Sequence, residues 1–305
     1  MQHTPLISVI IPTYNRADLL PRAVRSACGQ TYRNLEILIV DDASADNTEE
    51  VARVLEKEDA RVRYVKRKEN GGANAARNTG TQESKGEYIA LLDSDDEWLP
   101  EKIEKQIEVF EKSLDKRLGL VYCGYETICV ENGKKYPEKI HTPKKRALKK
   151  LLIQNIIGTS SVLIKKSFLQ KSGEFDEHEQ LVIGEDHDMW IRLAEHCTFA
   201  CLPNVCLLYY VHAKSTTSTT QTKVFTQSQD YLFQKHRTLY EKYPSAYTQA
   251  LVRYALRLVL YKQPRRAMHT MVQAFKMRPC IAFFAVPAHA FSFASKIIRK
   301  KIHGC

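Results

Sequence analysis

The sequence predicts an α/β fold in which a mostly parallel sheet is flanked by helices and followed by a C-terminal helical extension. Two patterns lead to this prediction. Apolar, β-branched runs alternate with amphipathic helical segments in the first half of the chain, as in parallel sheets with helices on both faces. From about residue 223 onward only helical patterns remain. We therefore expect a sheet-containing domain over residues 1–222 and a helical extension over residues 223–305.

The first four elements follow one another closely. Residues 6–11 are a short apolar, β-branched run that Pro12 ends, as expected of a buried strand. Residues 17–28 place apolar side chains at helical spacing and are followed by a glycine that favours a helix stop. Residues 35–40 repeat the buried-strand pattern. Residues 47–57 have one apolar helical face and are preceded by serine and aspartate, which are good helix caps.

The next four elements continue the alternation. Residues 62–65 are a third strand, and the small residues 71–76 open a helix after two glycines. Residues 88–92 are a fourth apolar strand, which runs directly into four polar residues. Residues 101–110 form a helix, with Pro100 at a position that suits a helix start. Alternation of this length indicates a sheet with crossover helices.

The pattern becomes mixed after residue 118. Residues 118–122 and 160–164 have the composition of strands, and residues 148–154 have helical spacing. An amphipathic helix begins at residues 189–193, directly after a cluster of acids.

Composition agrees with a folded protein and excludes several classes. The chain has 305 residues, of which 44% are hydrophobic and 27% charged, so it can bury a full core. The eight cysteines form no CxxC pair, which favours structural thiols over a metal site. The N-terminus lacks a signal-peptide pattern, and no run of about 18 uncharged apolar residues predicts a membrane span. We therefore expect a cytoplasmic protein with reduced thiols.

The net charge of +11 is concentrated in two places. Residues 262–305 contain nine Lys or Arg and no acid, and a second basic stretch covers residues 134–150. The apolar residues 280–294 lie beside the basic flank 296–302, a composition typical of a helix that lies on a membrane surface. Packing of this helix on the rest of the protein is the alternative. No nucleic-acid partner is expected, because the basic residues flank apolar surface rather than a reading motif.

Polar residues follow three of the predicted strands. PTYN (12–15) follows the first strand, Asp41 and Asp42 follow the second, and DSDD (93–96) follows the fourth. Ligands bind at the carboxyl ends of the strands in sheets of this kind. Asp and Asn also cap loops and helices after strands, which would explain any one of the three segments. Three such segments at one edge favour a binding site.

Short motifs then occur in a fixed order along residues 5–215. They are ISVIIPTYN (7–15), QTY (30–32), EILIVDDAS (36–44), NGG and ARNTG (70–72 and 76–80), DSDD (93–96) and GEDHDMW (184–190). Together they resemble the family-2 glycosyltransferases of the GT-A fold, the nucleotide-diphospho-sugar transferase fold. The helical tail matches that family only loosely.

The resemblance implies a nucleotide-sugar site at the sheet edge. Tyr14 would stack on the base, and Asp42 would accept a hydrogen bond from N3–H of uracil, which would reject a base without that donor. Arg77 would add a charged contact to the nucleotide, and Asp93 would face the ribose hydroxyls. The matching motifs also place Pro12, Thr13, Asn15, Asn70 and Ser94 in this site.

The resemblance also implies a divalent cation, Mn²⁺ or Mg²⁺. Asp95 would bind it together with oxygens of the donor diphosphate, since hard cations prefer oxygen ligands. His212 matches a position that contacts the metal or the diphosphate in some family members. A plain surface histidine is the equal alternative at that position.

The acidic motif before residue 189 would supply the catalytic base. By resemblance, Asp186 takes the proton from the acceptor hydroxyl during in-line attack on the anomeric carbon, so configuration inverts. Glu185 and Asp188 are close in sequence, and the sequence does not decide which carboxylate points inward. These acids would also favour the start of the following helix, where negative charge is stabilising.

The expected function is inverting, metal-dependent transfer of a sugar from a nucleotide-sugar, with a UDP-sugar as the expected donor. The expected acceptor is a glycan or a lipid-linked hydroxyl, in cell-surface polysaccharide or lipopolysaccharide synthesis at the inner face of the cytoplasmic membrane. The absence of a Gln-x-x-Arg-Trp motif and of long apolar spans disfavours a processive synthase. A nucleotidyltransferase is disfavoured because no glycine-rich loop follows the first strand. The remaining alternative is a non-catalytic protein of the same fold that binds nucleotide-sugars or a membrane surface.

Overall fold

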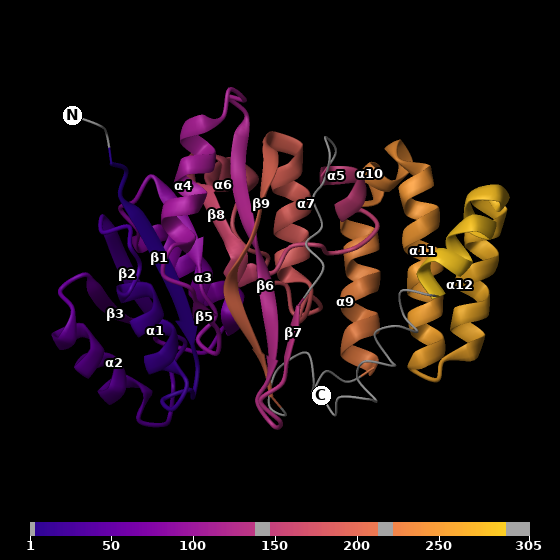
Figure 1. Cartoon of the computed structure of the whole chain (residues 1–305). Coiled ribbons are helices and arrows are strands. Elements are labelled where there is room, and N and C mark those ends of the chain that lie inside the picture. The colour runs from indigo at the N-terminus through magenta and orange to yellow at the C-terminus, as the bar shows by residue number, and fades with distance from the viewer. Residues whose placement is uncertain (1–3, 138–146, 213–221, 291–305) are drawn as a thin grey trace.

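The computed structural model describes residues 4–137, 147–212 and 222–290. Its centre is a nine-stranded sheet in the order β3-β2-β1-β4-β8-β6-β9-β5, with β7 paired to β6 (Figure 1). The predicted α/β fold is confirmed.

The first half of the sheet is the parallel part that the sequence predicts. It consists of β1 (Ile7–Thr13), β2 (Leu35–Asp41), β3 (Val62–Lys66) and β4 (Tyr88–Leu91). β1 lies between β2 and β4, and both pairings are parallel. β1 is buried along its whole length, because helices cover both faces of this part of the sheet.

The second half of the sheet makes it mixed. It contains β5 (Glu97–Trp98), β6 (Leu118–Cys129), β7 (Lys135–Pro137), β8 (Val162–Lys165) and β9 (Thr198–Val211). β8 is antiparallel to both β4 and β6, while β6 and β9 are parallel. β6 and β9 therefore point the same way as β1–β4, and only β5, β7 and β8 are reversed. The carboxyl ends of six strands thus reach one edge of the sheet.

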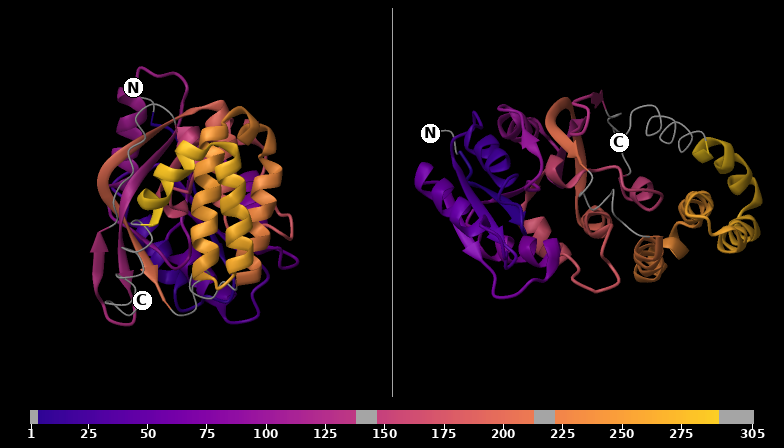
Figure 2. Two further views of the ribbon diagram at one scale, coloured as in Figure 1. Left: turned by 90° about the vertical axis from the view of Figure 1, so that its right-hand side faces the viewer. Right: turned by 90° about the horizontal axis from the view of Figure 1, so that it is seen from below.

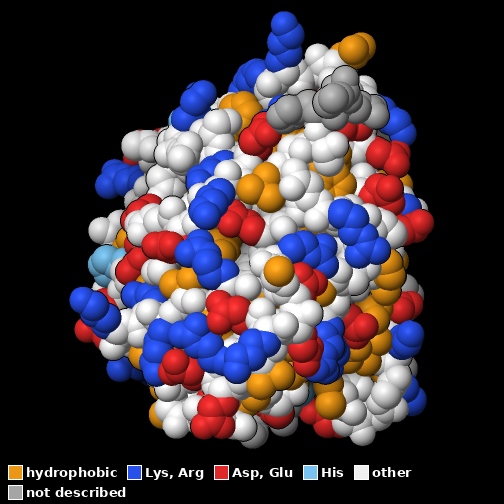
Figure 3. All heavy atoms as spheres, turned by 90° about the vertical axis from the view of Figure 1, so that its left-hand side faces the viewer, with side chains coloured by type: hydrophobic (Ala, Val, Ile, Leu, Met, Phe, Trp, Pro, Cys, Tyr) orange, Lys and Arg blue, Asp and Glu red, His pale blue; other side chains and the backbone are white. Residues whose placement is uncertain are grey.

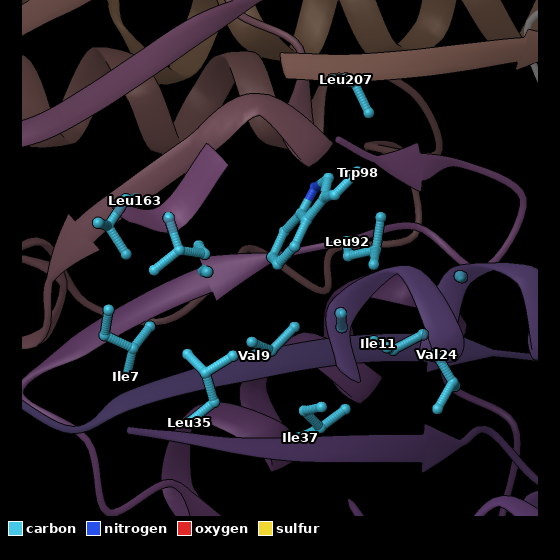
Figure 4. Packing of buried hydrophobic residues seen from close by; sticks show 14 of the residues in the cluster. Ile7, Val9, Ile11, Val24, Leu35, Ile37, Leu92, Trp98, Leu163 and Leu207 are labelled. Atoms are coloured by element: carbon cyan, nitrogen blue, oxygen red, sulfur yellow. The ribbon is translucent and has the colours of Figure 1, made fainter. Parts of the chain in front are cut away.

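Helices cover both faces of this sheet. α1 (Leu20–Cys28), α2 (Thr48–Glu58) and α4 (Lys102–Lys112) pack on one face. Figure 4 shows this core, in which Val24 of α1 lies beside Ile11 of β1, and Trp98 lies beside Leu92, the residue after β4. α3 (Gly72–Glu83), α5 (Ala147–Leu151), α6 (Lys166–Ser172) and α7 (Glu185–His196) pack on the other face. The cysteines 123, 197 and 206 are buried, and no group of three His, Cys, Asp or Glu side chains in the described ranges is arranged to hold a metal ion by itself.

Several element boundaries differ from the sequence prediction. The helix predicted over residues 71–76 extends to Glu83, and β6 continues seven residues beyond the predicted 118–122. The sequence patterns do not predict β5, β7 or α6, which are short, and they do not give the bounds of β9. Short elements carry too few residues for their periodicity to stand out.

The described chain after residue 221 is helical, as predicted. It forms α9 (Thr222–Lys235), α10 (Arg237–Lys242), α11 (Pro244–Leu260), α12 (Pro264–Met277) and a helix over residues 279–290 (Figure 2). Side chains of α10 and α11 join the same apolar cluster as α7. The division into two domains near residue 222 stays a prediction. Within the described ranges, none of the helices combines the length and apolarity needed to cross a bilayer.

Candidate active site

The loops that follow β1 and β2 are held together at the carboxyl edge of the sheet. The carbonyl of Thr13 accepts a hydrogen bond from the backbone N–H of Asp42 at 2.9 Å. Asn15 donates its backbone N–H to Ser44 Oγ (2.9 Å), and its side-chain oxygen accepts from the N–H of Ala45 (2.8 Å). Asn15 has φ 50°, in the left-handed region that asparagine tolerates. Asn15 therefore joins the loop after β1 to the loop after β2, where the sequence predicts the nucleotide-sugar site.

Three neighbours of Asn15 line the same loop. Pro12 and Thr13 are buried at the end of β1, and Tyr14 is 45% exposed. The buried Oγ1 atom of Thr13 has no hydrogen-bond partner within the described residues. A buried hydroxyl without a partner is costly, so this atom is suited to a bond with a ligand. The exposed ring of Tyr14 is accessible for stacking on a base.

Asp42 is buried and its carboxylate already has partners. Oδ1 pairs with the guanidinium of Arg67, and Oδ2 accepts the backbone N–H of Gly72 at 2.7 Å. The N–H of Gly71 lies 3.1 Å from Oδ1, and the side-chain amide of Asn70 donates to the Asp42 carbonyl at 3.2 Å. Gly72 has φ 82°, which glycine adopts without strain. A uracil ring that bonds Asp42 would have to replace some of these contacts.

Arg77 links the end of β4 to the start of α7. Its guanidinium donates to Asp93 Oδ1 at 2.8 Å and to Glu185 Oε1 at 3.1 Å, and it lies 5.7 Å from the centre of the Phe175 ring. Burial opposes the charge of Arg77, but the carboxylates of Asp93 and Glu185 raise its pKa above the ordinary value. Asp93 and Glu185 are 92 positions apart in the sequence, and Arg77 bonds both, so it connects the two segments.

The DSDD segment divides into buried and accessible side chains. Ser94 and Asp96 are buried, whereas Asp93 and Asp95 are partly exposed. Ser160 accepts the backbone N–H of Asp93 (3.1 Å) and donates to Asp96 (2.5 Å). Burial, followed by the charges of Asp93 and Asp95, raises the pKa of Asp96 well above its usual range. Asp96 therefore supports the loop, while the side chains of Asp93 and Asp95 remain partly accessible at the sheet edge.

Asp95 lies beside His212, the residue that follows β9. His212 Nε2 is 3.2 Å from Asp95 Oδ2. Asp95 also forms an ion pair with Arg16, and Arg22 donates to its backbone carbonyl while stacking 3.6 Å from the centre of the Tyr210 ring. The carboxylate is 17% exposed. The two predicted metal ligands thus meet at one point of the edge, although 117 positions separate them.

The Asp95 and His212 pair fits a divalent cation whose remaining ligands come from a bound substrate. An Asp oxygen and a His nitrogen supply two donors, and no third His, Cys, Asp or Glu completes the set in the part of the chain that the structure describes. Oxygens of a bound diphosphate would have to supply the remaining ligands, which is common for Mg²⁺ with nucleotide substrates. Arg16 occupies the position opposite Asp95, so binding of a cation requires that this side chain move.

The three acids at the start of α7 have three different environments. Glu185 pairs with Arg77. Asp188 is fully buried and bonds Arg192 (2.7 Å), Lys235 (2.9 Å) and His236 (2.8 Å), so it joins α7 to α9 and the start of α10. These partners use both oxygens of Asp188, which makes it a structural anchor.

Asp186 is the acid of this motif that has no cationic partner in the described residues. Its Oδ2 accepts from Asn155 Nδ2 (2.8 Å) and from Thr159 Oγ1 (3.3 Å), and its Oδ1 accepts from the N–H of His187 (2.6 Å). Burial is the main cause of a raised pKa at Asp186, and the bond from Asn155 opposes it. A half-buried carboxylate held by neutral donors keeps the basicity that a general base needs.

Sequence reasoning did not identify several residues that shape this site. Arg16, Arg67, Asn155, Thr159 and Ser160 all contact predicted site residues. Arg16 directly follows the first motif, and this position is the one sequence feature that could have identified it as a site residue. The other four lie outside the motifs, so their roles depend on the fold.

Comparison with known proteins identifies similar sequences. Residues 8–170 match the family model described as Glycosyl transferase family 2. A protein described as an uncharacterized glycosyltransferase from Rickettsia prowazekii is 37% identical over 221 residues, which are 71% of this chain and 67% of that protein. WfgD of Escherichia coli, named a UDP-Glc:alpha-D-GlcNAc-diphosphoundecaprenol beta-1,3-glucosyltransferase, is 33% identical over 203 residues, 64% of this chain and 75% of that protein.

Solved structures share the fold. TarS of S. aureus, residues 1–349 in complex with UDP-GlcNAc, aligns with a TM-score of 0.70 and 16% identity over 92% of this chain and 84% of that one. The mannosyltransferase PcManGT of Pyrobaculum calidifontis, in complex with GDP-Man and Mn²⁺, aligns with a TM-score of 0.54 and 18% identity over 98% of this chain and 81% of that one. At these identities the likeness concerns the fold alone.

Proposed function

This chain belongs to glycosyl transferase family 2, and from that membership we propose that it transfers a sugar from a nucleotide-sugar to an acceptor hydroxyl with inversion at the anomeric carbon. One observation carries the proposal. Asp93 and Asp95 after β4 and Asp186 at the start of α7 lie around one edge of the sheet, and the Arg77 bridge between Asp93 and Glu185 ties the two segments together.

The donor is proposed to be a UDP-sugar. The accessible ring of Tyr14 and the partnerless hydroxyl of Thr13 offer a stacking surface and a polar contact at the loop after β1. Asp42, Asn70 and Asp93 are the residues proposed to make further polar contacts with this donor. The names of the relatives support this choice, because WfgD is named for UDP-Glc and TarS was solved with UDP-GlcNAc. Recognition of uracil as the nucleobase of the donor requires that uracil replace Arg67 as a partner of the Asp42 carboxylate.

Asp95 and His212 are the residues that would hold a divalent cation, either Mn²⁺ or Mg²⁺. When bound, such a cation would neutralise the negative charge that develops on the leaving diphosphate. The Mn²⁺ complex of PcManGT supports this assignment. In the donor-free protein the positive charge of Arg16 balances Asp95.

Asp186 is proposed to remove the proton from the acceptor hydroxyl. As that oxygen forms its bond to the anomeric carbon, the bond from the same carbon to the diphosphate breaks on the opposite face, and the proton moves to the Asp186 carboxylate. Asn155 and Thr159 orient this carboxylate by hydrogen bonds. Its raised pKa makes it a stronger base than an exposed aspartate.

The acceptor is proposed to be a growing cell-surface glycan, including one carried on a lipid diphosphate. The name of WfgD, which includes a diphosphoundecaprenol acceptor, supports this class. An acceptor of this kind would place the enzyme at the cytoplasmic face of the membrane. A non-catalytic nucleotide-sugar-binding protein of the same fold is the alternative.

Two measurements test the proposal. The first is thermal unfolding with a panel of nucleotides, each with and without Mn²⁺. UDP should raise the unfolding temperature, and Mn²⁺ should enlarge this rise. A ligand at about 100 times its dissociation constant adds about 2.7 kcal/mol to the free energy of unfolding. No rise with any nucleotide would contradict a nucleotide-sugar site.

The second measurement separates binding from catalysis. Asp186→Asn should keep the UDP-dependent rise and lose turnover by about 10²-fold or more. Asp115→Asn, which changes an exposed acid that bonds Thr198 at the start of β9, is the matched control. Loss of UDP binding in Asp186→Asn, or full turnover, would remove Asp186 as the base. Intact donor binding without turnover in the unmodified protein, across sugars and acceptors, would favour the non-catalytic alternative.

A further inference from the structure

α12 presents an apolar face away from the rest of the protein. Ala267, Thr270 and Ala274 are buried, on the side that packs against the molecule. The exposed side chains Met268 (67% exposed) and Val272 (43%), with Phe275, occur at helical spacing on a different face. An ordinary surface helix shows the reverse arrangement, with polar residues on its outer side.

The helix over residues 279–290 repeats this arrangement. Ala282 and Ala285 are buried against α11 and α12, whereas Phe283 and Phe284 are 65% and 72% exposed. Both helices lie at the end of the molecule beyond α11 (Figure 2). We refer to the exposed side chains Met268, Val272, Phe275, Phe283 and Phe284 as the apolar face.

Basic side chains accompany the apolar face on α12 and just after it. The chain contains no Asp or Glu after Glu241. Arg265, Lys276 and Arg278, on α12 and just after it, are exposed, and none of them forms an ion pair within the described ranges. Arg266, on the same helix, is neutralised by Asp230. The opposite end of the molecule differs, because there acidic and basic side chains are intermixed (Figure 3).

This combination suits an anionic lipid surface better than a second copy of the chain. Two copies paired about a twofold axis would bring the same basic residues against each other. A bilayer that contains anionic lipids accepts apolar side chains at the acyl boundary and basic side chains at its headgroups. A partner with negative charge and an apolar layer therefore matches both features of this end.

We propose that α12 and residues 279–290 dock on an anionic membrane surface and lie along it. Phe283, Phe284 and Met268 enter the headgroup and acyl boundary, while Arg265 and Lys276 contact lipid phosphates. The site rests on described residues; the basic flank 296–302 singled out in the sequence lies outside them. The proposal goes beyond sugar transfer, since lipid binding requires neither donor nor acceptor.

Sedimentation with vesicles tests this docking. The full chain should bind phosphatidylcholine vesicles that contain about 30% phosphatidylglycerol at least tenfold more tightly than pure phosphatidylcholine vesicles, and added salt should weaken this binding. Phe283→Ser combined with Phe284→Ser should weaken it at least tenfold, and so should Arg265→Gln combined with Lys276→Gln. Val54→Ser, at an exposed apolar position on α2, is the matched control and should bind normally.

A gain-of-signal measurement guards against variants that merely unfold. Lipids with brominated acyl chains should quench the fluorescence of the new tryptophan in a Phe284→Trp variant but not in a Val54→Trp variant. The native Trp98 and Trp190 are buried, so the bound lipid should not quench their fluorescence. Equal binding of the double variants and the full chain, or no quenching at position 284, would overturn the proposal. So would a dimer in light scattering that the Phe283/Phe284 variant abolishes while vesicle binding is unchanged. A UDP-dependent thermal shift measured on the same samples reports the donor site separately.

Discussion

Arg67 and Asp42 form an ion pair at the point where the predicted uracil contact should occur. Asp42 is buried, and the N–H groups of Gly71 and Gly72 also point at it. A carboxylate accepts about four hydrogen bonds, so its capacity is nearly used. Recognition of uracil by Asp42 therefore requires that Arg67 release one oxygen.

Arg67→Gln is expected to strengthen UDP binding severalfold, because uracil would no longer compete with a charged partner for Asp42. Titration calorimetry with UDP measures this change. Arg63→Gln, which removes a partly exposed arginine of β3 that pairs with Glu83 at the end of α3, is the control. An unchanged UDP affinity in Arg67→Gln would mean that Asp42 shapes the Gly71–Gly72 turn and does not read the base.

The Asp95 and His212 pair predicts how metal contributes to binding. Asp95→Ala should abolish the part of the UDP-dependent thermal shift that Mn²⁺ adds, and His212→Ala should weaken Mn²⁺ binding about tenfold while leaving some response. Arg16→Ala should strengthen binding of Mn²⁺ alone, since the competing cation is gone. Thermal unfolding with UDP measures the first effect, and paramagnetic resonance of free Mn²⁺ measures the Mn²⁺ affinity of all three variants. Equal Mn²⁺ affinity in the Asp95 variant would exclude this residue as a ligand.

The raised pKa of Asp186 predicts the pH dependence of turnover. The base must be ionised, so kcat/KM should fall as pH drops through its pKa, at a pH above the ordinary aspartate value of 3.8. Asn155→Ala removes a bond that stabilises the ionised form. The fall should therefore move to higher pH. If the pH profile of Asn155→Ala were identical to that of the unmodified protein, the fall of kcat/KM at low pH would not report ionisation of Asp186.

Asp188 predicts a large effect on stability. Burial opposes its charge, but bonds from His236, Arg192 and Lys235 lower its pKa below the ordinary value. Asp188→Asn removes the buried negative charge that faces Arg192 and Lys235, and should cost about 3–5 kcal/mol at pH 7. The stabilising contribution is present above the unfolded pKa and is lost as pH falls through the folded pKa. Urea unfolding of the two proteins should therefore converge towards low pH; a constant difference would contradict this origin.

Lys102 predicts a change in stability at alkaline pH. It is fully buried, bonds Gln106 at 2.8 Å, and burial lowers its pKa to about 8. Between that pH and the unfolded value of 10.5 the unfolded chain holds one more proton, so stability should rise with pH. The rise amounts to about 3 kcal/mol. Lys102→Met should lack it, and Lys105→Met, at a neighbouring and more exposed lysine, should retain it. If the free energy of unfolding changed with pH in the same way in Lys102→Met and in the unmodified protein, the lowered pKa of Lys102 would be refuted.

Local sequence was sufficient for the first half of the fold. The runs before Pro12, Asp42 and Asp93 are apolar and β-branched, and they form buried strands within one or two residues of the expected ends. The family is confirmed by the comparisons. The reversed direction of β8 was not predictable, because strand direction depends on the path of the preceding chain and leaves no periodicity in the strand itself.

The site shows the same division. The sequence alone determined the family, the motifs at the sheet edge and the helical tail, because these depend on residue types at fixed short spacings. Tertiary structure decided which partners each acid of the α7 motif has. Glu185, Asp186 and Asp188 are nearly adjacent in sequence, yet helix geometry turns them toward Arg77, Asn155 and His236. Partners such as Arg67 and Arg16 come from distant segments, so their effect on Asp42 and Asp95 exists only once the chain is folded.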